Sequence, residues 1–460
     1  MKINRLLFLF LAVLAVILAV RCSKNNIIIN PSDARLACNG FCPISKHTVH
    51  EYLLKDYLMK KCPSTKANDI EIDVITGEAG DTLMYIVNYG LEKGWEVISA
   101  DTRTPAVIAA GNRGYLNFDS CNPGLKDWLF CTKEDMQIIV QSSDDDLSFS
   151  EDEIEAHKQF WGGGQPRIKL PDIDDPGGGS WYTSITTVTE VWDSISHMTA
   201  TQWDQDSPYN EYCPYRTDTI GRAPAGCVAI AGAQMLYYLH YKIGVPSMIY
   251  TNAYCYGDIL NHTITFTGSS STIWDDMDTL SKAYNAPAGP ESILIAFVGA
   301  RVQMDYGNTS SGAETEDLVE NVFNLFGIDC VYDNYDASIV KSSLLSGLPV
   351  ILSTKSSWLS TGGHAFIIDG YKRYRTITTE YHYWMSSSGE PGTDPLHEPY
   401  EVIHYSSPSI EYFKMNWGWW EQWQLGYDDG WYAPTGDWYT QSTGDHNNYY
   451  RKMIYGFNVE

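Results

Sequence analysis

Basic residues are few in this 460-residue chain, which holds 31 Lys and Arg against 57 Asp and Glu and carries a net charge of −26. No long run of Lys and Arg occurs in it. Nucleic-acid binding requires a surplus of such cations on one face of a protein, so the composition argues against a nucleic-acid partner. Because 44% of the residues are hydrophobic and only 19% are charged, the composition also excludes a disordered protein.

Only one long apolar run is present, from Leu6 to Val20, preceded by two basic residues. This run is short for a hydrocarbon layer of about 30 Å but is typical of a signal-peptide core. Cys22 follows it and matches the acceptor of a bacterial lipoprotein signal. Three interpretations of residues 1–22 stay open, namely lipidation of Cys22, plain secretion and a retained membrane anchor. Each predicts a protein outside the cytoplasm, secreted or anchored to the cell envelope, with membrane contact only through the anchor.

The chain has ten cysteines, and in an exported protein such a number normally indicates disulfides. Their spacing is irregular, so the sequence does not say which of them pair. Cys38 and Cys42 could form half of a zinc site, but no equally close pair of Cys or His completes it. We therefore expect neither a metal nor a cofactor.

Composition changes along the chain predict two folded regions joined by a linker. Residues 23–143 are expected to form a small α+β domain with strands near 83–89, 95–100 and 105–109. Residues 144–185 contain an acidic block and two glycine-rich stretches, and like charges and glycines disfavour packing. We expect an exposed, cleavable linker there. Residues 186–460 again have the composition of a folded domain.

Cys227 is the residue on which the functional prediction depends. It follows Pro224, Ala225 and Gly226, and a segment rich in small apolar residues comes after it. This pattern predicts a buried helix that begins at Cys227. The free N–H groups and the positive dipole at a helix N-terminus favour the thiolate over the thiol. The alternative is a small buried cysteine that only packs.

Two later segments support a nucleophile. His364 follows two glycines and begins a strongly apolar strand, and Asn416 lies on a later strand beside Trp417. Cys227 and His364 are 137 positions apart, within the roughly 130–150 positions that separate these residues in papain-like enzymes.

Five short motifs occur in order: Trp-Asp-Gln-Asp-Ser-Pro-Tyr-Asn around Gln205, Ala-Gly-Cys-Val-Ala around Cys227, Met-Asp-Tyr-Gly at 304–307, Gly-Gly-His-Ala-Phe-Ile-Ile-Asp-Gly around His364, and Asn-Trp-Gly-Trp from Asn416. In these motifs and their order the chain resembles the streptopain family of papain-like cysteine peptidases. Gly-Trp-Glu-Val-Ile-Ser-Ala-Asp at 94–101 resembles the propeptide of the same family.

The resemblance implies an α+β fold, in which a papain-like peptidase domain with a helical lobe and an antiparallel β lobe follows a small α+β propeptide domain. It implies Cys227 as nucleophile, His364 as general base and acid, Asn416 as the residue that orients the imidazole, and Gln205 as an oxyanion-hole donor. Gly363, Ser311 and Gly312 would hold the substrate backbone, and Trp417 would cover the hydrogen bond between histidine and asparagine.

The function implied is an endopeptidase made as a zymogen, with protein or peptide substrates and its own propeptide as intramolecular inhibitor. Two alternatives stay open, a non-catalytic surface lipoprotein that binds peptide or glycan and an acyl-transferring transpeptidase. The chain also departs from the family pattern, because His364 and Asn416 are 52 positions apart and an insert lies around residues 385–399. We therefore expect an altered rim on the substrate side and do not carry over the specificity.

Overall fold

The computed structural model describes residues 41, 43–52, 70–90, 93–119, 121–162, 179–245, 250–255, 262–267, 272–355, 363–386, 401–406, 409–419, 430–437 and 451–459. The predicted signal segment with Cys22, and the cysteines Cys38 and Cys42, lie outside these residues. No helix within the described ranges is long and apolar enough to cross a membrane.

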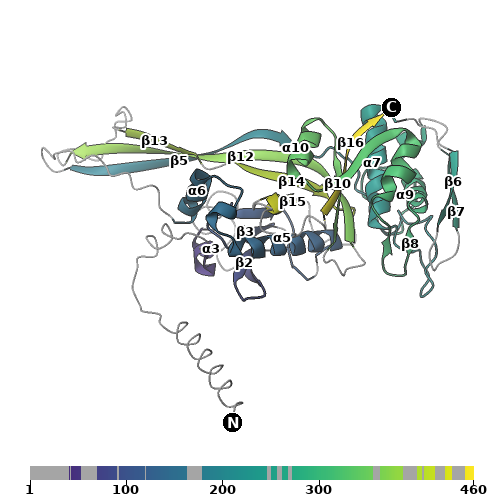
Figure 1. Cartoon of the computed structure of the whole chain (residues 1–460), viewed down its shortest axis with the longest axis horizontal. Coiled ribbons are helices and arrows are strands. Elements are labelled where there is room, and N and C mark those ends of the chain that lie inside the picture. Colours follow the sequence, from purple (N-terminus) through teal and green to yellow (C-terminus); the bar gives the residue numbers. More distant parts are fainter. Residues whose placement is uncertain are drawn as a thin grey trace, which may run out of the picture.

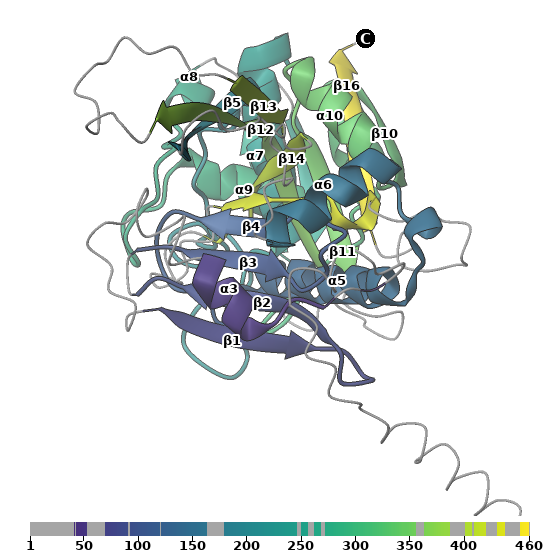
Figure 2. The same cartoon turned by 90° about the vertical axis from the view of Figure 1, so that its left-hand side faces the viewer.

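The N-terminal domain, called the prodomain below, is a four-stranded antiparallel meander with helices on both faces (Figure 2). Its elements are α3 (Lys46–Tyr52), β1 (Glu71–Thr76), β2 (Thr82–Asn88), β3 (Trp95–Ser99), β4 (Val107–Gly111), α5 (Pro123–Gln141), the short 3-10 helix η3 (Asp144–Asp146) and α6 (Glu151–Gly162). The helix α5 begins where the sequence signals it, because Asn122 accepts a hydrogen bond from the Leu125 N–H and Pro123 follows.

The second domain has a helical lobe and a β lobe, as the sequence predicted. The helical lobe contains α7 (Cys227–Ile243), β6 (Tyr250–Cys255), β7 (His262–Thr267), α8 (Thr272–Asp275), α9 (Pro290–Arg301), β8 (Asp305–Tyr306), β9 (Ser311–Gly312), the π-helix η4 (Val319–Phe323) and η5 (Asn324–Phe326). The β lobe contains β5 (Gly179–Ile195), β10 (Ile328–Asn334), α10 (Ala337–Leu345), β11 (Val350–Lys355), β12 (Gly363–Ser386), β13 (Glu401–Ser406), β14 (Ile410–Asn416), β15 (Gly430–Tyr432), η6 (Thr435–Asp437) and β16 (Arg451–Val459).

One antiparallel sheet runs through both domains in the order β1-β2-β3-β4-β15-β14-β12-β11-β16-β10. The two domains meet where β4 pairs with β15, with Gly111 opposite Gly430 and Ala109 opposite Tyr432. One hydrophobic core also spans this junction, because Leu125 and Trp128 of α5 belong to the same buried cluster as Trp417 and Tyr432. The prodomain is therefore packed into the second domain through both its sheet and its helix.

Strand β12 is much longer than the sheet requires and forms a ribbon that extends from the body of the molecule (Figure 1). Its first half pairs with β11 and β14, and its second half pairs with β5 on one edge and β13 on the other. Gly179 of β5 lies opposite Ser386 at the far end. The predicted insert contributes residues 385–386 to this ribbon, whereas residues 387–400 lie outside the described residues.

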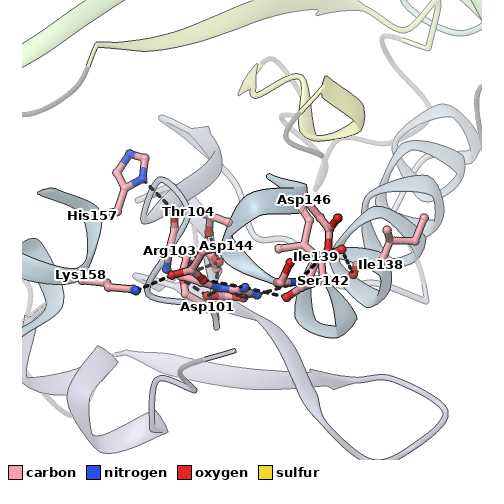
Figure 3. Close-up of polar contacts among 12 residues, drawn as sticks. Asp101, Arg103, Thr104, Ile138, Ile139, Ser142, Asp144, Asp146, His157 and Lys158 are labelled. Atoms are coloured by element: carbon pink, nitrogen blue, oxygen red, sulfur yellow. Dashed lines mark hydrogen bonds and ion pairs between the residues drawn. The ribbon is translucent and has the colours of Figure 1, made fainter. Parts of the chain in front are cut away.

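The acidic end of the predicted linker is not an open segment, because residues 144–146 and 151–162 are helical. The reason is a buried cation that the linker prediction did not consider (Figure 3). Arg103, whose side chain is fully buried, binds Asp101 at 2.7 Å and Asp144 at 3.2 Å. Asp144 also binds Lys158 of α6 at 2.8 Å.

Arg103 also stabilises the end of α5. Its guanidinium donates to the carbonyls of Ile139 and Ser142, each at 2.7 Å, which are among the last groups of that helix. The Arg103 carbonyl in turn lies 2.9 Å from Nδ1 of the buried His157 in α6 (Figure 3). Residues up to Gly162 therefore belong to the prodomain, and of the predicted linker only residues 163–178 lie outside the described residues.

Candidate active site

Cys227 is the first residue of α7, as its sequence context predicted. The preceding Gly226 has φ of +89°, a conformation that favours glycine, and a Cβ there would lie 2.6 Å from the sulfur of Met304. The side chain of Cys227 is buried, and burial raises the pKa of its thiol. Hydrogen bonds from backbone N–H groups, including that of Val228, act in the opposite direction and favour the thiolate.

His364 is the second residue of β12 and pairs with Thr354 of β11. Its Nε2 lies 2.8 Å from the carbonyl oxygen of Trp417, to which the ring donates a hydrogen bond. Burial lowers the pKa of His364 to about 4, although the bond to the Trp417 carbonyl acts in the opposite direction. The ring is therefore neutral at physiological pH in this state of the protein.

The predicted nucleophile and base form no hydrogen bond with each other among the described contacts. The Sγ of Cys227 lies 4.0 Å from the carbonyl oxygen of Gly363, and no contact in the described part of the chain joins Sγ to the His364 ring. Both groups nevertheless lie at the junction of α7 and β12, because Gly363 directly precedes His364. The structure thus places Cys227 beside the start of the strand that carries His364, but without a hydrogen bond between Sγ and the imidazole.

Asn416 does not bind His364 directly among the described contacts. Its Nδ2 donates to the carbonyl of Thr201 at 2.9 Å and to Oε1 of Gln234 at 3.1 Å. The backbone carbonyl of the next residue, Trp417, makes the bond to the imidazole instead. In this structure the bond to the ring thus comes from the neighbour of Asn416, and the orienting role of Asn416 stays a prediction.

Gln205 has the features that an oxyanion-hole donor requires. Its carbonyl accepts a hydrogen bond from Ala225 N at 2.8 Å, which ties it to the loop before Cys227. Its side chain is buried, and Nε2 has no hydrogen-bond partner in the described structure. A buried amide donor without a partner has an energetic cost, and such groups are found where a ligand supplies the partner.

The four predicted substrate-binding residues lie at three separate places in the fold. Ser311 and Gly312 form β9, where Ser311 Oγ donates to the Pro224 carbonyl at 2.6 Å and a Cβ on Gly312 would meet open space. Gly363 is exposed at the start of β12. Trp417 is buried against Phe366, with ring centroids 4.4 Å apart, so its contacts in this structure are those of a core residue.

The first turn of α5 covers the site. A Cβ on Gly124 would lie 2.3 Å from Cδ2 and 2.6 Å from Nε2 of His364, and 2.7 Å from Trp417. Only a residue without a side chain can therefore pack against the imidazole here. Asp127 follows one turn later, and burial raises its pKa to about 6. The prodomain thus packs directly on the imidazole ring of His364.

Comparison with known proteins assigns both domains. The model of the Peptidase C10 family matches residues 203–432, half of the chain and most of the second domain. The chain belongs to the Peptidase C10 family. The model of the Spi protease inhibitor matches residues 46–136 of the prodomain. This C10 protein is a cysteine peptidase that carries its own inhibitor domain, as the motifs predicted.

Two relatives found by sequence agree with this assignment. Streptopain of Streptococcus pyogenes is 25% identical over 340 residues, covering 67% of this chain and 74% of the relative. The thiol protease/hemagglutinin PrtT of Porphyromonas gingivalis is 23% identical over 359 residues, covering 74% of this chain and 37% of the relative. Among solved structures, a prointerpain A fragment of Prevotella intermedia has 20% identity and a TM-score of 0.48, covering 84% of this chain and 99% of the fragment. Active interpain A has 24% identity and a TM-score of 0.36, covering 57% and 96%.

Sequence reasoning missed two groups at this site of the C10 peptidase. Asn122 and Pro123 are a recognisable helix start, but nothing in the sequence says that the Gly124 backbone packs on His364. Gln234 is part of an apolar helix pattern, and its contact with Asn416 crosses 182 positions. No group of three or more potential metal-ligating side chains occurs within the described ranges.

Proposed function

We propose that this C10 peptidase is exported as a zymogen and hydrolyses internal peptide bonds of proteins through a thiolate–imidazolium pair of Cys227 and His364. The observation that carries the proposal is the packing of Gly124 on the imidazole of His364. The site has its nucleophile at a helix N-terminus and its base on the adjacent strand, yet a helix of the inhibitor domain covers it. This is the arrangement of an enzyme that is kept inactive until the inhibitor leaves.

The proposed chemistry begins when α5 leaves and the His364 ring becomes free to approach Sγ. The imidazole takes the proton of Cys227, and the thiolate attacks the carbonyl carbon of the substrate. As the C–N bond breaks, the imidazolium returns the proton to the leaving amine. Water, deprotonated by His364, then attacks the thioester and releases the second product and the free thiol. Gln205 Nε2 and the Cys227 N–H would stabilise the oxyanion in both steps.

The processing site is proposed to lie within residues 163–178. Upstream of this window, Lys158 of α6 is bound to the prodomain through Asp144 and Arg103. Downstream of it, β5 pairs with β12 along its whole length. A cut inside either element would break packed structure, whereas a cut between them separates the two domains and leaves both intact.

Export rests on the sequence of residues 1–22, with Cys22 as the candidate lipid acceptor. We propose a location outside the cytoplasm, secreted or anchored to the cell envelope. Mass spectrometry of protein recovered from the producing cells is the test. A mature N-terminal cysteine carrying acyl chains would support the lipid anchor, and a cut at an unmodified residue would support secretion. An uncut N-terminus in protein from the membrane fraction would support a retained anchor, whereas an uncut N-terminus in the soluble cytoplasmic fraction would contradict export.

The enzymatic proposal is tested by incubating the purified full chain and following both casein hydrolysis and the new N-terminus. The wild type should cut itself between residues 163 and 178 and then hydrolyse casein, and Cys227→Ala should do neither. Cys330→Ala is the matched control, because it removes another free thiol, which lies on β10. Casein hydrolysis by Cys227→Ala at the wild-type rate would overturn the assignment.

A further inference from the structure

Gln234 lies on the catalytic helix, seven positions after Cys227. Seven positions are about two turns, so the two side chains lie on the same face of α7, roughly 10 Å apart along its axis. The Gln234 side chain is 1% exposed and therefore needs its hydrogen bonds satisfied inside the protein. Among the described residues, its hydrogen-bond partner is Asn416 at the end of β14.

The two side-chain amides face each other. Asn416 Nδ2 donates to Gln234 Oε1 at 3.1 Å, and Gln234 Nε2 donates to Asn416 Oδ1 at 3.5 Å. Asn416 Oδ1 also accepts a hydrogen bond from Gly418 N at 3.2 Å. The Asn416 side chain thus closes the turn formed by residues 416–418 and ties that turn to α7.

Packing holds the same turn against the helix. Gly418 has φ of +68°, and a Cβ there would lie 2.9 Å from Cγ2 of Ile230, one turn after Cys227 on α7. Trp417 lies between these two contacts, and its carbonyl oxygen accepts the hydrogen bond from His364 Nε2 at 2.8 Å. The carbonyl that orients the imidazole therefore belongs to a turn whose position is set by α7.

We propose that Gln234 is a positioning residue of this peptidase. It holds the turn 416–418 so that the Trp417 carbonyl fixes the orientation of His364 relative to Cys227. Asn416 then acts through the backbone of the next residue rather than by touching the ring. The nucleophile and the support of its base share one rigid element, so they keep their relation when the prodomain leaves. This inference rests on the proposed chemistry of Cys227 and His364.

The hydrogen-bonded side chains of Gln234 and Asn416, called the clamp below, should affect the pKa of His364 in a way that can be measured. A hydrogen bond from Nε2–H to a carbonyl stabilises the imidazolium and raises the histidine pKa, as the Trp417 bond does here. When Gln234 no longer holds the turn, this bond lengthens and the pKa of His364 in the working enzyme falls. The alkaline limb of the pH–rate profile should then move to lower pH. KM should change little, because the buried Gln234 is remote from the substrate.

The test compares Gln234→Met, Asn416→Ala and the double variant in the full chain, after processing has ended and active sites have been titrated with a thiol-directed epoxide. Gln234→Met keeps the length of the side chain and removes its polar atoms. The expected result is a fall in kcat of about five- to tenfold with KM unchanged, together with the shifted alkaline limb. The double variant should be no worse than Asn416→Ala, since both changes break the same clamp.

Two further variants keep the test decisive. Gln234→Glu retains the oxygen that accepts from Asn416, and its kcat should lie closer to the wild-type value than that of Gln234→Met. This variant also provides a test if Gln234→Met folds poorly. Tyr238→Phe is the matched control, because it removes the 2.7 Å bond from α7 to the Gly347 carbonyl without touching the clamp. If Gln234→Met behaves like Tyr238→Phe in kcat and in pH profile, or if the single effects add, the positioning role is wrong. If the wild type itself is inactive, or Cys227→Ala is active, the proposed function fails instead.

Discussion

Asp135 of α5 and Arg451 of β16, which are 316 positions apart, form a buried ion pair between the prodomain and the peptidase domain. Arg451 Nη2 lies 2.7 Å from Asp135 Oδ2, and Thr435 Oγ1 donates to the same oxygen at 2.6 Å. The Asp135 side chain is fully buried and that of Arg451 is 6% exposed. The helix that covers His364 is thus fixed to the catalytic β lobe near its middle.

Replacing Asp135 should weaken the binding of the prodomain to the peptidase domain. In Asp135→Asn the buried Arg451 keeps its charge without a compensating anion, which costs roughly 3 kcal/mol. We expect a lower midpoint of thermal unfolding for the uncut chain, measured with Cys227→Ala present to prevent processing. With Cys227 intact, casein hydrolysis should begin earlier. Asp145→Asn removes the same charge from an exposed prodomain residue and should change neither property. Equal effects of the two variants would contradict a specific role of the Asp135–Arg451 ion pair in holding the prodomain.

A methyl group at position 124 should also uncover the site. Because a Cβ on Gly124 would lie 2.3 Å from the His364 ring, Gly124→Ala forces α5 away from the imidazole. The expected result is faster alkylation of Cys227 by iodoacetamide in the uncut chain, with Lys126→Ala on the exposed side of the same helix as control. Unchanged alkylation in Gly124→Ala would mean that this contact does not control access to the site.

Acid should favour release of the prodomain through His364. While α5 covers the ring, burial lowers the pKa of His364 to about 4, whereas an uncovered histidine has a pKa near 6.5. The uncovered state therefore binds the proton more tightly, and docking loses free energy as the pH falls from about 6.5 to about 4, by at most about 3 kcal/mol. NMR titration of His364 in Cys227→Ala, before and after processing by an added protease, measures both pKa values directly. Equal values would rule out this linkage.

Asp127 should oppose that acid effect. Burial raises its pKa to about 6 in the covered state, so its protonation favours docking as the pH falls below that value. Asp127→Asn removes this opposing contribution, and release should then shift to higher pH. Hydrogen exchange of the α5 amides in the uncut Cys227→Ala chain, corrected for intrinsic exchange, follows release. A shift to lower pH would contradict the assigned sign.

Gln205 should matter for rate and not for stability. Its buried Nε2 has no partner among the described residues, so truncation removes no described hydrogen bond of this donor. If Nε2 stabilises the oxyanion, Gln205→Ala should lower kcat by about 10²–10³-fold with thermal stability retained. Gln202→Ala, which removes an amide bonded to Ser281 N from the same segment, should leave kcat near the wild-type value. A similar loss of kcat in both would argue for a general distortion of the loop.

Local signals predicted the parts of the fold that depend on nearby residues. The expected strands 83–89 and 95–100 correspond to β2 and β3, and the helix expected to begin at Cys227 does so. In each case the determining chemistry, a run of mostly apolar or small side chains with a glycine close to one end, is contained within a few residues of the element.

Contacts between distant residues could not be predicted in the same way. The acidic residues from 144 onward favoured an open linker because their compensating cation, Arg103, lies about forty positions earlier and is buried. The pairing of β5 with β12 depends on a register between segments nearly 200 positions apart. Likewise, the family resemblance implied that Asn416 orients the ring, and only the turn geometry shows that the Trp417 carbonyl makes the bond to Nε2 in this structure.

The ribbon formed by β12 with β5 and β13 bears on how the first processing cut is made. His364 is the second residue of β12, while Gly179, where β5 begins, lies opposite Ser386 at the other end of that strand. At about 3.3 Å per residue this places the two ends some 70 Å apart. A cut at the β5 end of the 163–178 window would thus lie far from the active centre of its own molecule, and we expect another copy to make it. Activation should accordingly follow second-order kinetics, with a lag that shortens as the protein is concentrated and lengthens on dilution.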